Sequence, residues 1–146
     1  MPHPRSVRFD AAVADRLARF VVRHPEVSGS AAVNRFVDEG LRMEEHPGVI
    51  FRSGPAGRRA VLVGGPDIWE VIRAVRDARS AEPGPEGDRV LELVETSTGV
   101  PLRMIRTALA YWAAYPEDVD AAVSDGDLAE QAEVERRHRT DALLAP

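Results

Sequence analysis

One short stretch near the N-terminus limits the possible folds of this chain more than any other feature. Residues 6–9 alternate polar and apolar side chains, which is the pattern of a strand with one buried face. The apolar face would carry Val7 and Phe9, and the polar face Ser6 and Arg8. Because unpaired backbone N–H and C=O groups are costly to bury, such a strand needs a partner strand. We expect the partner to be the same strand of a second copy, which makes the protein a dimer; pairing elsewhere within the chain is the alternative.

Two amphipathic helices are predicted directly after this strand. The first is capped by Asp10 and closed by Pro25. The second can be capped by Ser28 or Ser30. Their apolar stripes, which a dimer of this segment can bury, are Val13, Leu17, Phe20 and Val21 in the first helix and Val33, Phe36, Val37 and Leu41 in the second. The expected dimer core is Val7, Phe9, Leu17, Phe36 and Val37.

A two-stranded ribbon fits the major groove of DNA, where an arginine can contact guanine with two hydrogen bonds. The order strand, helix, helix over the first 43 residues resembles the ribbon-helix-helix family of CopG-like and Arc-like repressors, which includes many antitoxins. The resemblance implies that Ser6 and Arg8 contact bases. Arg5 departs from the family, which usually has an apolar residue at this position, and we expect it at the edge of the ribbon as a further base contact. It also implies that the start of the second helix holds a DNA phosphate, at Ser28, Gly29 and Ser30.

A second module is predicted from residue 46 to residue 123. Two β-like runs, 49–51 and 60–63, flank a turn rich in Gly and Pro and predict a hairpin. A helix should start at Asp67, which has capping-box spacing to a glutamate three residues later. Two more helices, 88–96 and 101–115, are joined by a short turn with a glycine, the layout of a helix-turn-helix.

The arginines of this module suggest a second DNA surface. The last helix is apolar on two faces, and its one polar edge consists of Arg103, Arg106 and Thr107. An ordinary buried helix with two solvated arginines is the alternative for this edge. The hairpin tip is flanked by Arg52, Arg58 and Arg59. These three residues predict either a wing that touches phosphate or a solvated turn.

Residues 46–123 also resemble a small antitoxin-associated family whose formal name is only domain of unknown function four-three-three. The resemblance rests on His46-Pro47-Gly48, on the helix start Pro66-Asp67-Ile68-Trp69, and on the stretch 105–111 before Tyr115-Pro116. It implies a compact winged-helix-like unit, often encoded beside a PIN-like toxin nuclease that would be its partner. The acidic Pro/Gly loop at 80–88 and the preceding ribbon-helix-helix depart from that family, so a stand-alone regulator is equally expected.

The rest of the chain is predicted to be an acidic, charged helical tail, residues 124–146. A helix should begin at Pro116, break at residues 124–127 and resume to residue 144. Charge is unevenly distributed, with seven arginines against five acidic residues in 1–43 and three against nine in 116–146. Because binding to a polyanion depends on the local patch, the net charge of −5 does not exclude DNA binding. The tail is either a solvated helix or a segment that docks on a basic partner.

The composition excludes several classes of protein. Without cysteine the chain has no disulfide and no thiolate zinc site, and its four histidines lack metal-ligand spacing. No serine lies in a nucleophile motif, so we expect neither an enzyme nor a cofactor. The absence of a long apolar run and of a signal peptide predicts a cytoplasmic, nucleoid-associated protein. All 19 basic residues are arginine, which is typical of genomes rich in G and C, such as those of actinobacteria.

The expected fold is mainly α with short β elements. It comprises a dimeric ribbon-helix-helix domain in residues 1–45, a helix-turn-helix or winged-helix-like domain in 46–123, and the tail in 124–146. The expected function is a sequence-specific repressor that binds double-stranded DNA as a homodimer or higher oligomer. As an antitoxin it would regulate its own operon. The alternative is an adaptor that binds a protein partner through the C-terminal module and the acidic tail.

Overall fold

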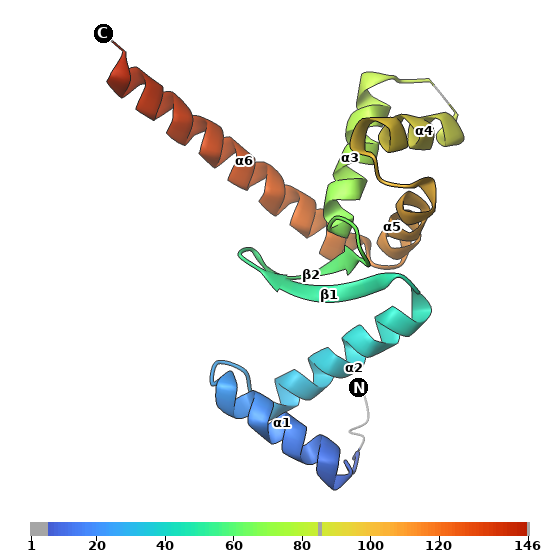
Figure 1. Cartoon of the computed structure of the whole chain (residues 1–146), viewed down its shortest axis with the longest axis vertical. Helices are drawn as coiled ribbons and strands as arrows, with labels where there is room; N and C mark the ends of the chain where they lie inside the picture. The colour runs from blue at the N-terminus through green and yellow to red at the C-terminus, as the bar shows by residue number, and fades with distance from the viewer. Residues whose placement is uncertain (1–5, 85, 146) are drawn as a thin grey trace. The chain divides into compact units, whose positions relative to one another are not determined.

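The computed structural model describes residues 6–84 and 86–145 (Figure 1). Within these residues the chain is mainly helical with short β elements, as the sequence predicts; it has six helices and one two-stranded antiparallel sheet. It divides into two compact units, residues 1–44 (unit 1) and residues 45–146 (unit 2). The elements are α1 (Ala11–Arg23), α2 (Gly29–Glu45), β1 (Val49–Gly54), β2 (Gly57–Leu62), α3 (Ile68–Ala81), α4 (Gly87–Thr98), α5 (Leu102–Ala114) and α6 (Pro116–Leu144).

The two helices of unit 1 begin at caps that the sequence predicts. The amide of Val13 donates to Oδ1 of Asp10 at 2.8 Å, and the amide of Ala31 donates to Oγ of Ser28 at 3.1 Å. Each cap satisfies an amide of the first turn that has no partner within its own helix. Both predicted helices are confirmed, and of the two serines proposed as caps for α2, Ser28 takes the role.

Residues 6–10, which precede α1, form no strand in the described part of the chain. Residues 6–10 are described, and none of them pairs with β1, β2 or any other described segment. The alternative that this stretch pairs within its own chain is therefore wrong for the described residues. Pairing with a second copy stays a prediction. Arg5, expected at the edge of the ribbon, lies outside the described residues.

The predicted hairpin opens unit 2. Val49 pairs with Leu62 at its base and Gly54 with Gly57 at its tip, which leaves residues 55–56 as a two-residue turn. Gly57 has a φ of +100°, a backbone conformation that glycine adopts without steric cost. The base of the hairpin is buried and its tip is exposed, so the hairpin is held to the rest of unit 2 at its base.

The core of unit 2 lies between the base of the hairpin, α3, α4, α5 and the first turns of α6. At the start of α3 the amide of Asp67 donates to Oε2 of Glu70 at 3.0 Å, as the capping-box spacing predicts. A short turn joins α4 to α5, with Gly99 at a φ of +72°. The two helices and the turn between them thus have the layout that the sequence predicts. The largest fully buried side chains in the core of unit 2 are Tyr111, Leu62, Ile68, Ile105, Val49 and Val94.

The helix α6 is continuous, and the break predicted at residues 124–127 is wrong. Gly126 suggested that break, but it lies against the indole ring of Trp69 in α3. A Cβ on Gly126 would come within 2.4 Å of Cζ3 of that ring. The missing side chain therefore serves close packing of α6 on α3, while the helical backbone continues through this position. None of the described helices combines the length and apolar character needed to cross a bilayer.

The acidic surplus of α6 lies in the half that packs on unit 2, not in its far end. Residues 116–130 contain six acidic residues and no arginine, whereas residues 131–146 contain three of each. Four of the six pair with arginines of β2 and α3: Asp125 with Arg59, Asp127 and Glu130 with Arg73, and Asp120 with Arg76. The tail expected at 124–146 is therefore neither a separate helix nor acidic throughout.

Candidate nucleic-acid interface

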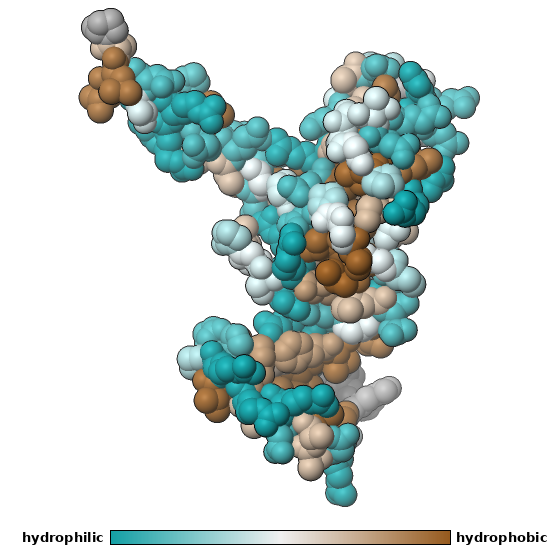
Figure 2. Space-filling model, viewed as in Figure 1, coloured by the Kyte–Doolittle hydropathy of each residue, from teal (hydrophilic) through white to brown (hydrophobic). Residues whose placement is uncertain are grey.

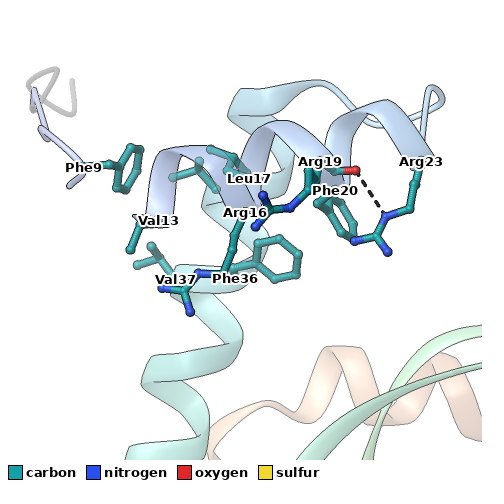
Figure 3. A pocket seen from close by; sticks show the side chains of 10 residues that line it. Phe9, Val13, Arg16, Leu17, Arg19, Phe20, Arg23, Phe36 and Val37 are labelled. Carbon is teal, nitrogen blue, oxygen red and sulfur yellow. Dashed lines mark hydrogen bonds between the residues drawn. The ribbon is translucent and has the colours of Figure 1, made fainter. Parts of the chain in front are cut away.

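An open apolar groove runs along unit 1 between α1 and α2 (Figure 3). Its volume is about 560 Å³, with Phe9 at one end and Arg23 at the other. The apolar side chains that line it are Phe9, Val13, Leu17, Phe20, Val33, Phe36 and Val37. Figure 2 shows apolar side chains at the surface of unit 1, among polar ones. A groove of this composition is costly to leave in water, since apolar area gains roughly 25 cal/mol per Å² on burial.

Unit 1 has almost no core of its own. Among its described residues, Ala32 is the only buried apolar side chain, and α1 contains no buried residue. The helices of unit 1 contribute large apolar side chains that remain substantially exposed, among them Phe36 at 40% and Val37 at 54%. Because helix stability in proteins comes mostly from packing an apolar face, unit 1 needs a cover that the single chain does not provide.

The structure brings together four of the five residues expected in the dimer core. Phe9, Leu17, Phe36 and Val37 all line the groove. Val7, the fifth, is 68% exposed and is not among the lining residues. In a strand with alternating faces Val7 would share the side of Phe9, so pairing of residues 6–9 would be needed to bring it to the groove.

An aromatic cluster supports the far end of the groove. The rings of Phe20 and Phe36 meet edge to face at 4.9 Å between centroids, and His24 stacks on Phe20 at 4.1 Å. The guanidinium of Arg35 lies over both phenylalanine rings, at 5.3 and 4.9 Å from their centroids. The sequence stripe includes both phenylalanines, but it gives no signal for Arg35, because this contact joins two helices.

The predicted DNA-contacting residues of unit 1 lie at its surface. Ser6 and Arg8 are both exposed in the stretch before α1. At the start of α2, Oγ of Ser28 is occupied by the amide of Ala31 and acts as a cap, while Ser30 is exposed. The first amides of α2, with the positive end of the helix dipole, remain the groups suited to a phosphate.

Three arginines of α1 line one wall of the groove: Arg16, Arg19 and Arg23 (Figure 3). Their spacing of three and four residues places them on one flank of the helix, and this spacing could have identified them from the sequence. Nε of Arg23 donates to the carbonyl of Arg19 at 3.3 Å. A cation at this helix C-terminus is also favoured by the helix dipole. The apolar groove therefore has a basic border.

The hairpin arginines expected at a second DNA surface are engaged within unit 2. Nη2 of Arg52 lies 3.2 Å from Oδ1 of Asp67, and Nη1 of Arg58 donates to Oγ of Ser53 at 3.4 Å. Arg59 is the most enclosed of the three, with its side chain 14% exposed. Its guanidinium lies over the ring of Trp69 at 5.4 Å and 3.7 Å from Oδ2 of Asp125 in α6. Arg59 thus fastens the hairpin to α3 and α6.

The two arginines on the polar edge of α5 are exposed, as the sequence predicts, but the charge of Arg106 is paired with an acidic residue. Arg103 and Arg106 are exposed, and Thr107 is half-buried. Nη2 of Arg106 pairs with Oδ1 of Asp88 in α4 at 3.1 Å, and the Thr107 hydroxyl donates to the carbonyl of Arg103. Arg106 and the hairpin arginines therefore have partners on different elements of unit 2.

Ionic contacts with α3 hold the first half of α6 in place. Oδ1 of Asp120 accepts from Nε1 of Trp112 at 2.8 Å and from Arg76 at 2.6 Å. These two contacts, the Trp112 hydrogen bond first, hold the pKa of Asp120 below its usual value. The carboxylate of Glu130 accepts from Arg73 and raises the pKa of that guanidinium. The acidic half of α6 is thus a structural part of unit 2.

No protein-family model, no curated protein and no solved structure matches this chain. In the described part of the sequence, no group of His, Asp and Glu side chains is placed to hold a metal ion. Function is therefore inferred from the geometry of the chain itself. Its most informative feature is the uncovered apolar groove of unit 1.

Proposed function

We propose that this protein is a homodimeric, sequence-specific DNA-binding repressor that dimerises and reads DNA through unit 1. The observation that carries the proposal is the apolar groove on a unit with a single buried apolar side chain among its described residues. Such a unit is stable only when another surface covers it. A second copy of the chain is available whenever the chain is made, and it offers the same apolar groove in return.

The stretch before α1 favours a second copy as that cover. Its alternating residues 6–9 form no strand in the single chain, and two such stretches can pair antiparallel with each other. Pairing would turn Val7 and Phe9 toward the helices and leave Ser6 and Arg8 outward. A two-stranded ribbon of this kind fits the DNA major groove, with Arg8 as the residue that contacts guanine. This arrangement is the ribbon-helix-helix that the first 43 residues resemble.

The start of α2 adds the contact that orients the dimer on DNA. Its first turn, at Ser28, Gly29 and Ser30, offers backbone amides and the helix dipole to a phosphate. Phosphate contacts of this kind set the register, whereas base contacts give the sequence preference. Repression would then follow from occupying an operator in the protein's own promoter region.

Unit 2 extends this proposal to an antitoxin. Its helix, turn, helix order behind a hairpin fits the winged-helix-like unit of the antitoxin-associated family that the sequence resembles. The partner would be a PIN-like toxin, and the complex would be nucleoid-associated and autoregulatory. The pairing of Arg52, Arg59 and Arg106 with acidic residues of unit 2 favours protein binding over DNA binding for this unit.

The test is selection of bound sequences from random duplex DNA with the full chain, followed by binding titrations. Arg8→Ala should lose the enriched motif, since one good base contact is worth roughly 1–3 kcal/mol and a dimer makes it twice. The variant should remain dimeric, because Arg8 lies outside the groove. Arg137→Ala, which removes an exposed arginine at the far end of α6, is the matched control and should bind as the wild type. Wild-type affinity of Arg8→Ala for the selected motif would refute its role.

The second candidate function is a protein-interaction adaptor. The part of α6 from Leu128 onward favours it, because Leu128, Val134, Leu143 and Leu144 are all exposed there. Because helix stability in proteins comes mostly from packing an apolar face, a partner that covered these side chains would stabilise this part of α6 further. Recovery of no enriched DNA motif by the wild-type dimer would support this candidate over the repressor.

A further inference from the structure

Gly40 lies at the centre of the exposed apolar face of α2. With 3.6 residues per turn, Gly40 follows Val33 by about two turns and comes one turn after both Phe36 and Val37. Leu41 continues the face next to it. Phe36, Val37 and Leu41 are 40%, 54% and 58% exposed, so the glycine is bordered by apolar side chains without cover.

No contact within the described part of the chain requires a glycine at this position. A Cβ on Gly40 would meet no heavy atom within 4 Å, and the residue lies within a regular helix without positive φ. Gly126 differs, because a Cβ there would strike the ring of Trp69. Glycine in a helix interior is about 1 kcal/mol less favourable than alanine. The reason for Gly40 is therefore to be sought outside the single chain.

We propose that Gly40 marks the point where α2 of a second copy crosses α2. This inference rests on the proposed dimer and specifies its geometry. In a two-fold symmetric interface a residue on the axis meets its own copy. Helix axes pack 8–10 Å apart according to the side chains at the contact, and a glycine pair permits the closest approach. Phe36, Val37 and Leu41 of both copies would then surround the crossing and cover each other.

A second copy is the occupant that the structure supports best. The face around Gly40 is continuous with the groove, because Phe36 and Val37 belong to both. The same groove holds Phe9, and the stretch that carries Phe9 needs an antiparallel partner of its own kind. One second copy therefore satisfies the strand, the groove and the α2 face together, whereas an unrelated partner would have to match all three.

Dimerisation measured by sedimentation over a dilution series tests the crossing. Gly40→Ala should raise the dimer dissociation constant severalfold and Gly40→Leu by at least about tenfold, because added side chains push the two helices apart. Helix propensity alone predicts the opposite sign for Gly40→Ala. The matched control is Gly87→Ala at the start of α4, where a Cβ also meets nothing within 4 Å, and it should leave the dissociation constant unchanged.

Cross-linking provides a readout that does not depend on affinity. The chain has no cysteine, so Gly40→Cys introduces a single thiol. Oxidation at high protein concentration should join two chains, since a disulfide forms when Cα atoms lie within about 7 Å. Ala31→Cys, on the opposite face of α2 and exposed, should not cross-link.

The outcomes separate this inference from the proposed function. If Gly40→Ala dimerises as well as or better than the wild type, and Gly40→Cys does not cross-link, the crossing is wrong. Specific DNA binding by a wild-type dimer would leave the repressor proposal standing in that case. A wild-type chain that binds its selected DNA as a monomer would overturn both.

Discussion

Replacing Gly126 by alanine tests the packing of α6 on α3 through the sign of its effect. In an unobstructed helix interior the change from Gly to Ala is worth about 1 kcal/mol of added stability. At Gly126, however, the new Cβ would lie 2.4 Å from Cζ3 and 2.6 Å from Cη2 of Trp69. The ring cannot move freely, because Nε1 donates to Asp67 at 3.2 Å and Arg59 lies over its face.

Overpacking of this kind usually costs about 1–3 kcal/mol, and two contacts far below van der Waals distance place Gly126→Ala near the upper end. Subtracting the gain in helix propensity leaves a net loss of about 2 kcal/mol. For a domain of this size each kcal/mol shifts Tm by roughly 4 °C, so unit 2 should melt about 8 °C lower. Thermal unfolding followed by tryptophan fluorescence measures this shift.

The double variant with Trp69→Ala supplies the control. Without the ring, the Cβ of Gly126→Ala has no obstacle. The double variant should therefore have a higher Tm than Trp69→Ala alone, because alanine adds about 1 kcal/mol of helix stability. A higher Tm for Gly126→Ala in the wild-type background would refute the reasoning, because it would show that α6 does not rest on Trp69.

Phe9→Ala should lower the stability of the folded dimer by about 3 kcal/mol, so that dimerisation and the helical signal of unit 1 are lost together. A monomer with an unchanged circular dichroism spectrum would contradict the shared core. Because the folded-state pKa of Asp120 is lowered, its stabilising effect is present above the usual value of 3.8 and is lost as the pH falls below it. Asp120→Asn should therefore show a smaller drop in Tm than the wild type between pH 6 and pH 3, and equal drops would exclude this carboxylate. A chain ending at Gln131 loses three arginines and three acidic residues, so its affinity for random duplex DNA at low salt should match that of the full chain. The variant Asp125→Asn/Asp127→Asn should bind the same DNA more tightly than the full chain. If instead the chain ending at Gln131 binds more tightly and the double variant does not, the charge of α6 acts through its far end.

Local signals account for what the sequence predicted correctly. Asp10, Ser28 and Gly99 mark helix ends through contacts within a few residues, and all three do so in the structure. The hairpin likewise follows from two β-like runs with a turn between them. The helical spacing of apolar residues also placed Leu17, Phe36 and Val37 on one groove.

Contacts between distant segments account for what the sequence could not show. Gly126 reads as a helix breaker unless Trp69 is known to lie against it, and these residues are far apart in the chain. Arg59 reads as free charge unless its contact with Asp125 is known. Sequence spacing reports the face of an element, not the element that will cover it.

Unit 1 and unit 2 fold by reactions of different order if unit 1 needs a second copy. Unit 2 has its own core and can fold as a single chain, whereas unit 1 has one buried apolar side chain among its described residues and would fold only on association. At low concentration the amount of folded dimer then varies with the square of the chain concentration, so halving the protein removes about three quarters of the dimer. If unit 1 contacts an operator as we propose, its folding would thus measure how much of the protein the cell contains, which suits a repressor that controls its own synthesis.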